Sequence, residues 1–222
     1  TDVGQKRSMN QDSVYARTKS IGSLENLFIV ADGMGGHQAG DFASNFVVEN
    51  LVRFFETPYP ERDVHGILKE GIRKVNRDLY ECTSRDPKLN GAGSTLVLAT
   101  IKGSVLYVAN IGDSRLYLLR EALEQITKDH SYVEELVAMG KLKRGSRDYL
   151  EKKNIITRAV GVSAQVDTDL FALKLKSGDQ ILMCSDGLSN MVDELEIEYI
   201  IRSEDGVESR AKALVDAANR SG

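Results

Sequence analysis

The hydrophobic pattern of the first part of the chain predicts a buried strand followed by two helices. Residues 27–31 are apolar without alternation, which at this length is typical of a strand buried on both faces. From Ala39 onward the apolar residues recur at helical spacing, and a second helical series follows an intervening loop. The two series are Ala43, Phe46, Val47, Leu51 and Phe54, and Leu68, Ile72, Val75, Leu79 and Cys82. We expect each helix to turn its apolar face toward the core.

Two later regions predict strand pairs joined by tight turns. Residues 94–101 are rich in β-branched side chains, and Lys102-Gly103 is a turn signal that leads into the next strand. A second pair of strands is expected at 170–175 and 180–184, with a turn at Ser177-Gly178-Asp179. The local pattern predicts a hairpin in both places.

The order of the elements indicates the fold class. Further strands are expected at 116–119 and 123–126, and helices at about 195–202 and 207–219. Runs of strands with helices before and after them, joined by hairpins and not by helical crossovers, indicate antiparallel sheets faced by helices. We therefore expect an α+β fold in layers, formed by one domain over residues 1–222.

A charged segment separates the two groups of strands. Ser131 is an N-cap candidate for a short apolar pattern, and Glu134 completes a capping box. Residues 140–153 are rich in Lys and Arg and show little apolar periodicity. A solvated, mobile loop is the expectation for this stretch, and a substrate-contacting flap is the alternative.

Composition excludes several classes of protein. The 222 residues hold 29 Lys plus Arg against 33 Asp plus Glu, a net charge of −4, so a nucleic-acid footprint lacks its basic excess. No apolar run is long enough for a membrane span. Cys82 and Cys184 form no metal-binding spacing and are expected to be small buried residues in a reducing cytoplasm. The expected partner is a protein or a small molecule.

Three aspartates lie beside glycines at the ends of apolar runs. Asp32-Gly33 follows the first strand, Gly112-Asp113 follows residues 105–111, and Asp186-Gly187 follows residues 180–184. Any one of them alone is read first as a tight turn. Together they indicate carboxylate oxygens brought to strand ends, which is what Mg²⁺ or Mn²⁺ requires. Such ions activate water and neutralise charge, so phosphate esters are the expected substrate class.

Six segments, in order along nearly the whole chain, resemble the metal-dependent serine/threonine protein phosphatases of the PP2C type (PPM family), bacterial branch. The segments are Asp2-Val3-Gly4 with Arg7 and Asn10-Gln11-Asp12, Val30-Ala31-Asp32-Gly33-Met34-Gly35-Gly36-His37, Gly93-Ser94-Thr95, Gly112-Asp113-Ser114-Arg115, Ile156-Thr157-Arg158-Ala159-Val160-Gly161, and Ser185-Asp186-Gly187-Leu188. The resemblance implies a four-layer α-β-β-α sandwich whose two antiparallel sheets are flanked by helices. It also implies hydrolysis of phosphoserine and phosphothreonine on proteins by a metal-activated water at a binuclear Mg²⁺ or Mn²⁺ centre.

By resemblance, the site residues take separate roles. Asp32 would bridge the two metals, the Gly33 carbonyl would bind one of them, and Asp186 would bind the other. Asp113, together with Asp186, would hold the third ion seen in bacterial relatives. Arg7 would bind the substrate phosphate, a role suited to its planar fork of donors. The segment 140–153 would be the flap beside the active site.

The chain departs from the family pattern at three places. Gln11 stands where many relatives carry Glu, so it is expected to reach a metal only weakly or through water, while Asp12 holds the outer waters. Met34 stands where animal relatives carry a histidine proposed as general acid, and that role is not transferred to His37. The sequence ends before the family's Gly-x-Asp-Asn motif and last strand, which normally supply a further carboxylate.

Two functions remain open at this point. The first is an enzyme, a protein phosphatase opposing a cognate serine/threonine kinase and acting as a monomer. The second is a non-catalytic module of the same fold that binds phosphoproteins, favoured by Gln11 and the absent carboxylate. Retention of Asp32, Asp113, Asp186 and Arg7 favours the enzyme.

Overall fold

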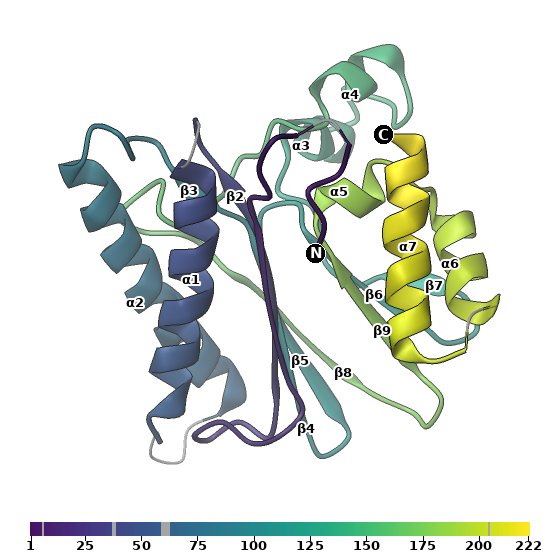
Figure 1. The fold of residues 1–222 in the computed structure, drawn as a ribbon, viewed down its shortest axis with the longest axis horizontal. Coiled ribbons are helices and arrows are strands. Elements are labelled where there is room, and N and C mark those ends of the chain that lie inside the picture. Colours follow the sequence, from purple (N-terminus) through teal and green to yellow (C-terminus); the bar gives the residue numbers. More distant parts are fainter. Residues whose placement is uncertain (6, 37–38, 59–62, 204) are drawn as a thin grey trace.

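The computed structural model describes residues 1–222 except residues 6, 37–38, 59–62 and 204. Two antiparallel sheets lie between two pairs of helices, so the expected α+β sandwich of four layers is confirmed (Figure 1). One outer layer is α1 (Ala39–Glu56) with α2 (Val64–Arg85), and the other is α6 (Glu194–Ser203) with α7 (Val207–Ser221). None of the helices in the described part of the chain combines the length and apolar composition that a membrane span needs.

The larger sheet has the order β1-β2-β4-β5-β8, and a short strand, β3, pairs with the end of β2. Its strands are β1 (Asp12–Arg17), β2 (Leu27–Met34), β3 (Gly93–Ser94), β4 (Leu96–Lys102), β5 (Val105–Ile111) and β8 (Asp169–Lys174). The expected hairpin is confirmed, since β4 and β5 pair in the register Leu98↔Ala109. Gly103 has a φ of 59° in the turn, a conformation that glycine adopts without strain.

The smaller sheet corrects one prediction. Its order is β7-β6-β9, formed by β6 (Arg115–Leu119), β7 (Leu123–Gln125) and β9 (Gln180–Cys184). The predicted second hairpin is wrong, because β8 pairs with β5 in one sheet while β9 pairs with β6 in the other. The turn at Ser177-Gly178-Asp179 is real, with Gly178 at φ 91°, but it carries the chain from sheet to sheet.

Three apolar clusters hold the layers together. The two first helices pack on the outer face of the larger sheet, where Leu51, Leu68 and Leu79 are fully buried. Val97, Val108 and Leu116 form the cluster between the sheets, and a third cluster lies under α6 and α7. The predicted helix faces are largely confirmed, except that Phe46, Phe54 and Cys82 are only partly buried.

Three short helices complete the fold at one end of the sandwich (Figure 1). They are α3 (Tyr132–Ala138), α4 (Arg147–Lys152) and α5 (Asp186–Ser189). Ser131 caps α3 as predicted, because its side chain accepts a hydrogen bond from the Glu134 N–H. The loop predicted over 140–153 is wrong at 147–152, where Ser146 caps α4 and Arg147 pairs with Glu151 one turn later, at 2.8 Å.

Candidate metal centre

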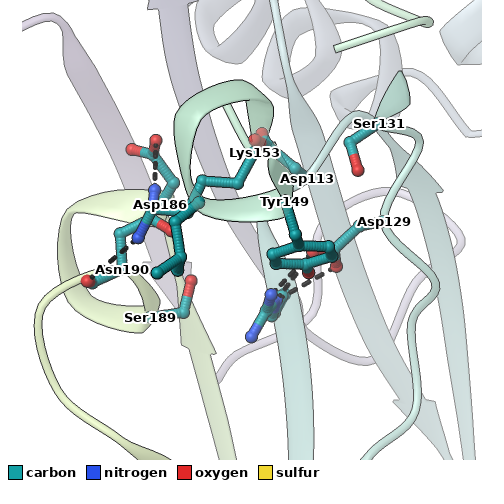
Figure 2. Close-up of a pocket in the computed structure, with 10 residues that line it drawn as sticks. Asp113, Asp129, Ser131, Tyr149, Lys153, Asp186, Ser189 and Asn190 are labelled. Carbon is teal, nitrogen blue, oxygen red and sulfur yellow. Dashed lines mark hydrogen bonds and ion pairs between the residues drawn. The ribbon is translucent and has the colours of Figure 1, made fainter. Parts of the chain in front are cut away.

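The predicted acidic residues meet at the end of the sandwich that carries α5. Asp12 opens β1 directly opposite Asp32 of β2, and both line a groove of about 440 Å³ together with Asp186. Asp113 and Asp186 line a neighbouring pocket of about 150 Å³ (Figure 2). Asp113 lies where the chain crosses from β5 in the larger sheet to β6 in the smaller one. The structure therefore brings together the four aspartates that the sequence analysis selected.

Asp32 is held by its backbone. The strand was expected to end before this residue, but β2 continues through Asp32 to Met34. The Asp32 N–H donates to Thr95 Oγ1 at 2.9 Å, and the Asp32 carbonyl accepts from the Thr95 N–H at 2.8 Å and from Ser94 Oγ at 3.1 Å. Thr95 Oγ1 is in turn 2.7 Å from Ser114 Oγ, in a buried contact. The carboxylate thus projects from a fixed peptide.

Gly33 lies where the end of β2 touches the first turn of α1. A Cβ on Gly33 would come within 1.9 Å of the Gly40 carbonyl oxygen, so only glycine fits this approach. The Gly33 N–H donates to the Gln11 carbonyl at 2.9 Å. Close packing therefore fixes the direction of the Gly33 peptide, whose carbonyl was predicted as a metal ligand.

Asp186 is held locally. It is the first residue of α5, and its Oδ2 accepts from Asn190 Nδ2 at 2.9 Å, within the same turn. The preceding residue, Ser185, donates from Oγ to Asp12 Oδ2 at 2.7 Å. This hydrogen bond connects the beginning of the chain with the strand that leads to Asp186. The resemblance implied a role for Asp12 in holding the outer waters and no role for Ser185.

One wall of the pocket in Figure 2 is an ion pair that sequence reasoning did not find. The Arg115 guanidinium binds both carboxylate oxygens of Asp129, with Nη2 at 2.7 Å from Oδ2, and its Nη1 donates to Tyr117 OH at 2.8 Å. Arg115 belongs to a quoted motif, but Asp129 carries no local signal of its role. Tyr149, Leu150 and Lys153 from the α4 region also line the pocket.

The electrostatics of the site fit a divalent cation. Burial, and then the neighbouring carboxylates of Asp12 and Asp186, raise the pKa of Asp32. Burial, and then Asp186, raise the pKa of Asp113 to about 7, and burial is also the main cause of the raised pKa of Asp12. Like charges this close cannot all ionise unless a cation compensates them. Without a cation, the raised pKa values favour the protonated forms of Asp12, Asp32 and Asp113.

The donor set is made of hard oxygens, which Mg²⁺ and Mn²⁺ prefer. Among the described residues, no three carboxylate, imidazole or thiol groups are gathered closely enough to enclose an ion on their own. Mg²⁺ is commonly bound through one or two carboxylates and keeps several waters. The aspartates and the Gly33 carbonyl therefore suit ions whose remaining ligands are waters.

The remaining predicted residues include Arg7 and Gln11, which both line the groove. Arg7 is exposed, lines the groove together with Asp12 and Asp32, and donates from Nη1 to Gln11 Oε1 at 3.5 Å. The Gln11 amide lies against Gly40, where an added Cβ would be 2.4 Å from Nε2. Met34 is the last residue of β2, and His37 lies outside the described residues.

Comparison with known proteins gives a consistent result. The family model described as protein phosphatase 2C matches residues 4–217. The serine/threonine phosphatase stp of Listeria monocytogenes serotype 4b is 37% identical over 235 residues, which cover 100% of this chain and 89% of the relative. Among solved structures, the S. agalactiae serine/threonine phosphatase has a TM-score of 0.92 at 34% identity, covering 100% of this chain and 91% of that chain. The catalytic domain of the serine/threonine protein phosphatase PstP, in complex with two manganese ions, has a TM-score of 0.85 at 35% identity, covering 100% and 90%.

Proposed function

This chain belongs to the protein phosphatase 2C family and is a metal-dependent protein serine/threonine phosphatase, and we propose that Asp32, Gly33 and Asp186 hold its two Mg²⁺ or Mn²⁺ ions. Asp32 would hold both ions, the Gly33 carbonyl would hold one of them, and Asp186 would hold the other. The observation that carries this assignment is the meeting of Asp12 and Asp32 from the larger sheet with Asp186, which follows β9 of the smaller sheet, at one groove. Burial and neighbouring carboxylates raise the pKa of Asp32 there.

When bound, the ions lower the pKa of water and neutralise the charge of the phosphate, which is the chemistry that phosphate-ester hydrolysis needs. The chain's own residues place the reactants around them. Arg7 binds the substrate phosphate with its fork of donors at the rim of the groove. Asp113, with Asp186, would hold a third ion, and Asp12 and Gln11 would order waters around the ions. Asp12 is oriented for this role by the hydrogen bond from Ser185.

The substrates are phosphorylated proteins. We propose further that the enzyme acts in the cytoplasm as a monomer and opposes a cognate serine/threonine kinase. Both cysteines are free, which suits a reducing compartment. The α4 region borders the pocket beside Asp113 and Asp186, so we propose that this flap contacts the substrate (Figure 2). The alternative of a non-catalytic module is set aside, because the relatives at this similarity are phosphatases and the four aspartates are in place.

Hydrolysis of a phosphothreonine peptide and of p-nitrophenyl phosphate, with Mn²⁺ and with a chelator, tests the assignment. We expect turnover only with the metal. Arg7→Ala should raise KM for both substrates, since a charged hydrogen bond to phosphate is lost. Arg17→Ala is the matched control, because Arg17 is also exposed but pairs with Leu27 at the opposite end of β1. An unchanged KM in Arg7→Ala would exclude the phosphate role.

A further inference from the structure

His130 is a buried histidine with no role in the proposed chemistry, and it forms two hydrogen bonds with Gly112, the residue before Asp113. It lies in the loop between β7 and α3 and is only 6% exposed. Its backbone N–H donates to the Gly112 carbonyl at 3.0 Å, and its ring Nδ1 accepts from the Gly112 N–H at 3.1 Å. Both polar groups of Gly112 are therefore bound by the same residue.

The ring is oriented from its other side. Because Nδ1 accepts a hydrogen bond, the proton of a neutral ring lies on Nε2. Nε2 is 3.2 Å from Asp169 Oδ2, and Arg158 Nη1 donates to Asp169 Oδ1 at 2.9 Å. The same Arg158 nitrogen is 3.3 Å from Nε2, so both donors converge on one carboxylate. Burial alone would raise the pKa of Asp169. The hydrogen bond from His130 and then the nearby charges outweigh burial, so the pKa is lowered.

Gly112 has a conformation and a close packing contact that only glycine accepts without strain. Its φ is 97°, and an added Cβ would lie 2.8 Å from Cβ of Thr95, the residue that holds the Asp32 peptide. Because Asp113 follows Gly112 in the link between β5 and β6, the orientation of the Gly112 peptide sets the orientation of the Asp113 backbone. A second contact steadies the same loop, because Asn110 Nδ2 donates to the Lys128 carbonyl at 3.0 Å.

The same histidine closes the base of the segment that carries α3 and α4. Its carbonyl accepts from the Thr157 N–H at 2.8 Å, and the next residue, Ser131, forms an isolated β-bridge with Ile156. Asp113 and the α4 region both line the pocket in Figure 2. The residue before Asp113 and the base of the α4 segment are thus both connected by hydrogen bonds to His130 or to its neighbour Ser131.

We propose that His130 is a positioning residue that acts through Gly112 to aim the Asp113 carboxylate at the pocket it shares with Asp186. The proposal rests on the role proposed above for Asp113 as a ligand of the third ion. It assigns the work to Nδ1 as an acceptor, while the contact of Nε2 with Asp169 only orients the ring. Residues that orient metal ligands typically affect metal affinity or activity by about 10- to 100-fold.

Two polar substitutions separate these two functions of the ring. His130→Asn keeps an acceptor oxygen near the position of Nδ1 and gives up the contact with Asp169. His130→Gln keeps a polar group near the position of Nε2 and leaves the Gly112 N–H without its acceptor. We expect His130→Gln to weaken the last Mn²⁺ bound in titration calorimetry by about 10-fold and to lower kcat, whereas His130→Asn retains most of both. Equal losses in the two variants, or a larger loss in His130→Asn, would overturn the proposal.

The Asp113→Asn background shows whether the effect passes through that carboxylate. If His130 acts through Asp113, adding His130→Gln to Asp113→Asn should change neither the number of ions bound nor kcat further. If Asp113→Asn binds fewer ions but His130→Gln binds Mn²⁺ and turns over like wild type, the His130 proposal is overturned while the third-ion role of Asp113 stands. An unchanged count in Asp113→Asn would remove the third-ion role of Asp113, and the proposal with it.

The native protein offers a measurement that does not depend on the folding of any variant. Long-range ¹H–¹⁵N correlation of the histidine rings reports which nitrogen carries the proton. We expect the Nε2–H form for His130, and a ring protonated on Nδ1 would contradict the hydrogen bond from Gly112.

Discussion

The Asp32-Gly33 and Asp186-Gly187 segments have nearly the same sequence pattern, but the first is the end of β2 and the second is the beginning of α5. In both, an apolar strand leads to Asp-Gly and then to a helix. Asp32 lies inside β2, opposite Asp12 of β1, and its peptide N–H and carbonyl both bind Thr95, the residue between β3 and β4. Asp186 begins a helix of four residues, and its carboxylate is bound by Asn190 of that turn.

The comparison shows that two carboxylates with the same proposed role as metal ligands can be held in place in two ways. Asp32 depends on long-range contacts, because its partners lie more than 60 residues away in sequence. Asp186 depends on a local turn whose own hydrogen bonds orient it. The two carboxylates should therefore be equally important for catalysis, whereas the residues around them should differ greatly in their tolerance of substitution.

The largest effect is expected from the carboxylates themselves. Asp32→Asn and Asp186→Asn should each lower kcat/KM by about 100-fold or more at saturating Mn²⁺, because each removes a strong electrostatic contact. Asp205→Asn, an exposed aspartate between α6 and α7, is the matched control. Circular dichroism should show the fold retained in all three. Activity above about a tenth of wild type in either site variant would show that Asp32 and Asp186 are not equally important for catalysis.

In the Asp32-Gly33 segment, Gly33→Ala should cause the largest loss of stability. The added Cβ would lie 1.9 Å from a backbone oxygen of α1, so the end of β2 and the helix must separate. We expect a loss of about 3 kcal/mol or more in the free energy of unfolding, as for other overpacked or strained sites. Urea denaturation of the metal-free protein gives the value. A loss below about 1 kcal/mol would mean that the contact between Gly33 and Gly40 is not needed.

Thr95→Val tests the long-range support of Asp32 with little change in shape. It leaves the Asp32 N–H without an acceptor, and an unsatisfied buried donor costs about 1–3 kcal/mol. Thr95→Ser, which keeps the hydroxyl, is the control. We expect the valine variant to lose both stability and Mn²⁺ affinity, measured by thermal melting and calorimetry. A serine variant that loses as much would show that the methyl group matters and the hydroxyl does not.

The smallest effect is expected at the second glycine. A Cβ on Gly187 meets nothing closer than Ser185 Oγ at 3.5 Å, and the residue is exposed within α5. Gly187→Ala should therefore stabilise the protein by about 0.4–1 kcal/mol, because alanine loses less conformational entropy than glycine in a helix. Urea denaturation beside Gly33→Ala completes the contrast. A destabilisation similar to that of Gly33→Ala would show that the Asp32-Gly33 and Asp186-Gly187 segments tolerate an added Cβ equally poorly.

The elements and the acids of the site could be predicted from the sequence because their signals are local. Apolar periodicity predicted the two first helices, β-branched residues with the Lys102-Gly103 turn predicted the hairpin of β4 and β5, and the capping-box pattern predicted the cap at Ser131. The strand-end aspartates were predicted from their neighbouring glycines. The helix α4 was missed because it is charged and exposed, although Ser146 and the pair Arg147–Glu151 are helix signals.

Features that depend on distant partners could not be predicted. A turn flanked by two strands looks the same whether the strands pair with each other or, as β8 and β9 do, with β5 and β6. The sequence likewise carries no sign that Thr95 binds the Asp32 peptide or that His130 binds Gly112. These contacts are decided by packing between segments that are far apart along the chain.

The contact between Ser185 and Asp12 has a consequence for how the protein folds and unfolds. It joins residues separated by 173 positions, across the two sheets, whereas Asp12 and Asp32 meet within adjacent strands. Closing so long a loop is costly in entropy, so we expect this contact to form late, when the sheets dock. Ions bound at the groove would then hold the docked sheets together and slow their separation. Unfolding rates from stopped-flow mixing should fall when Mn²⁺ replaces a chelator, and equal rates would place the docking of the sheets outside the barrier to unfolding.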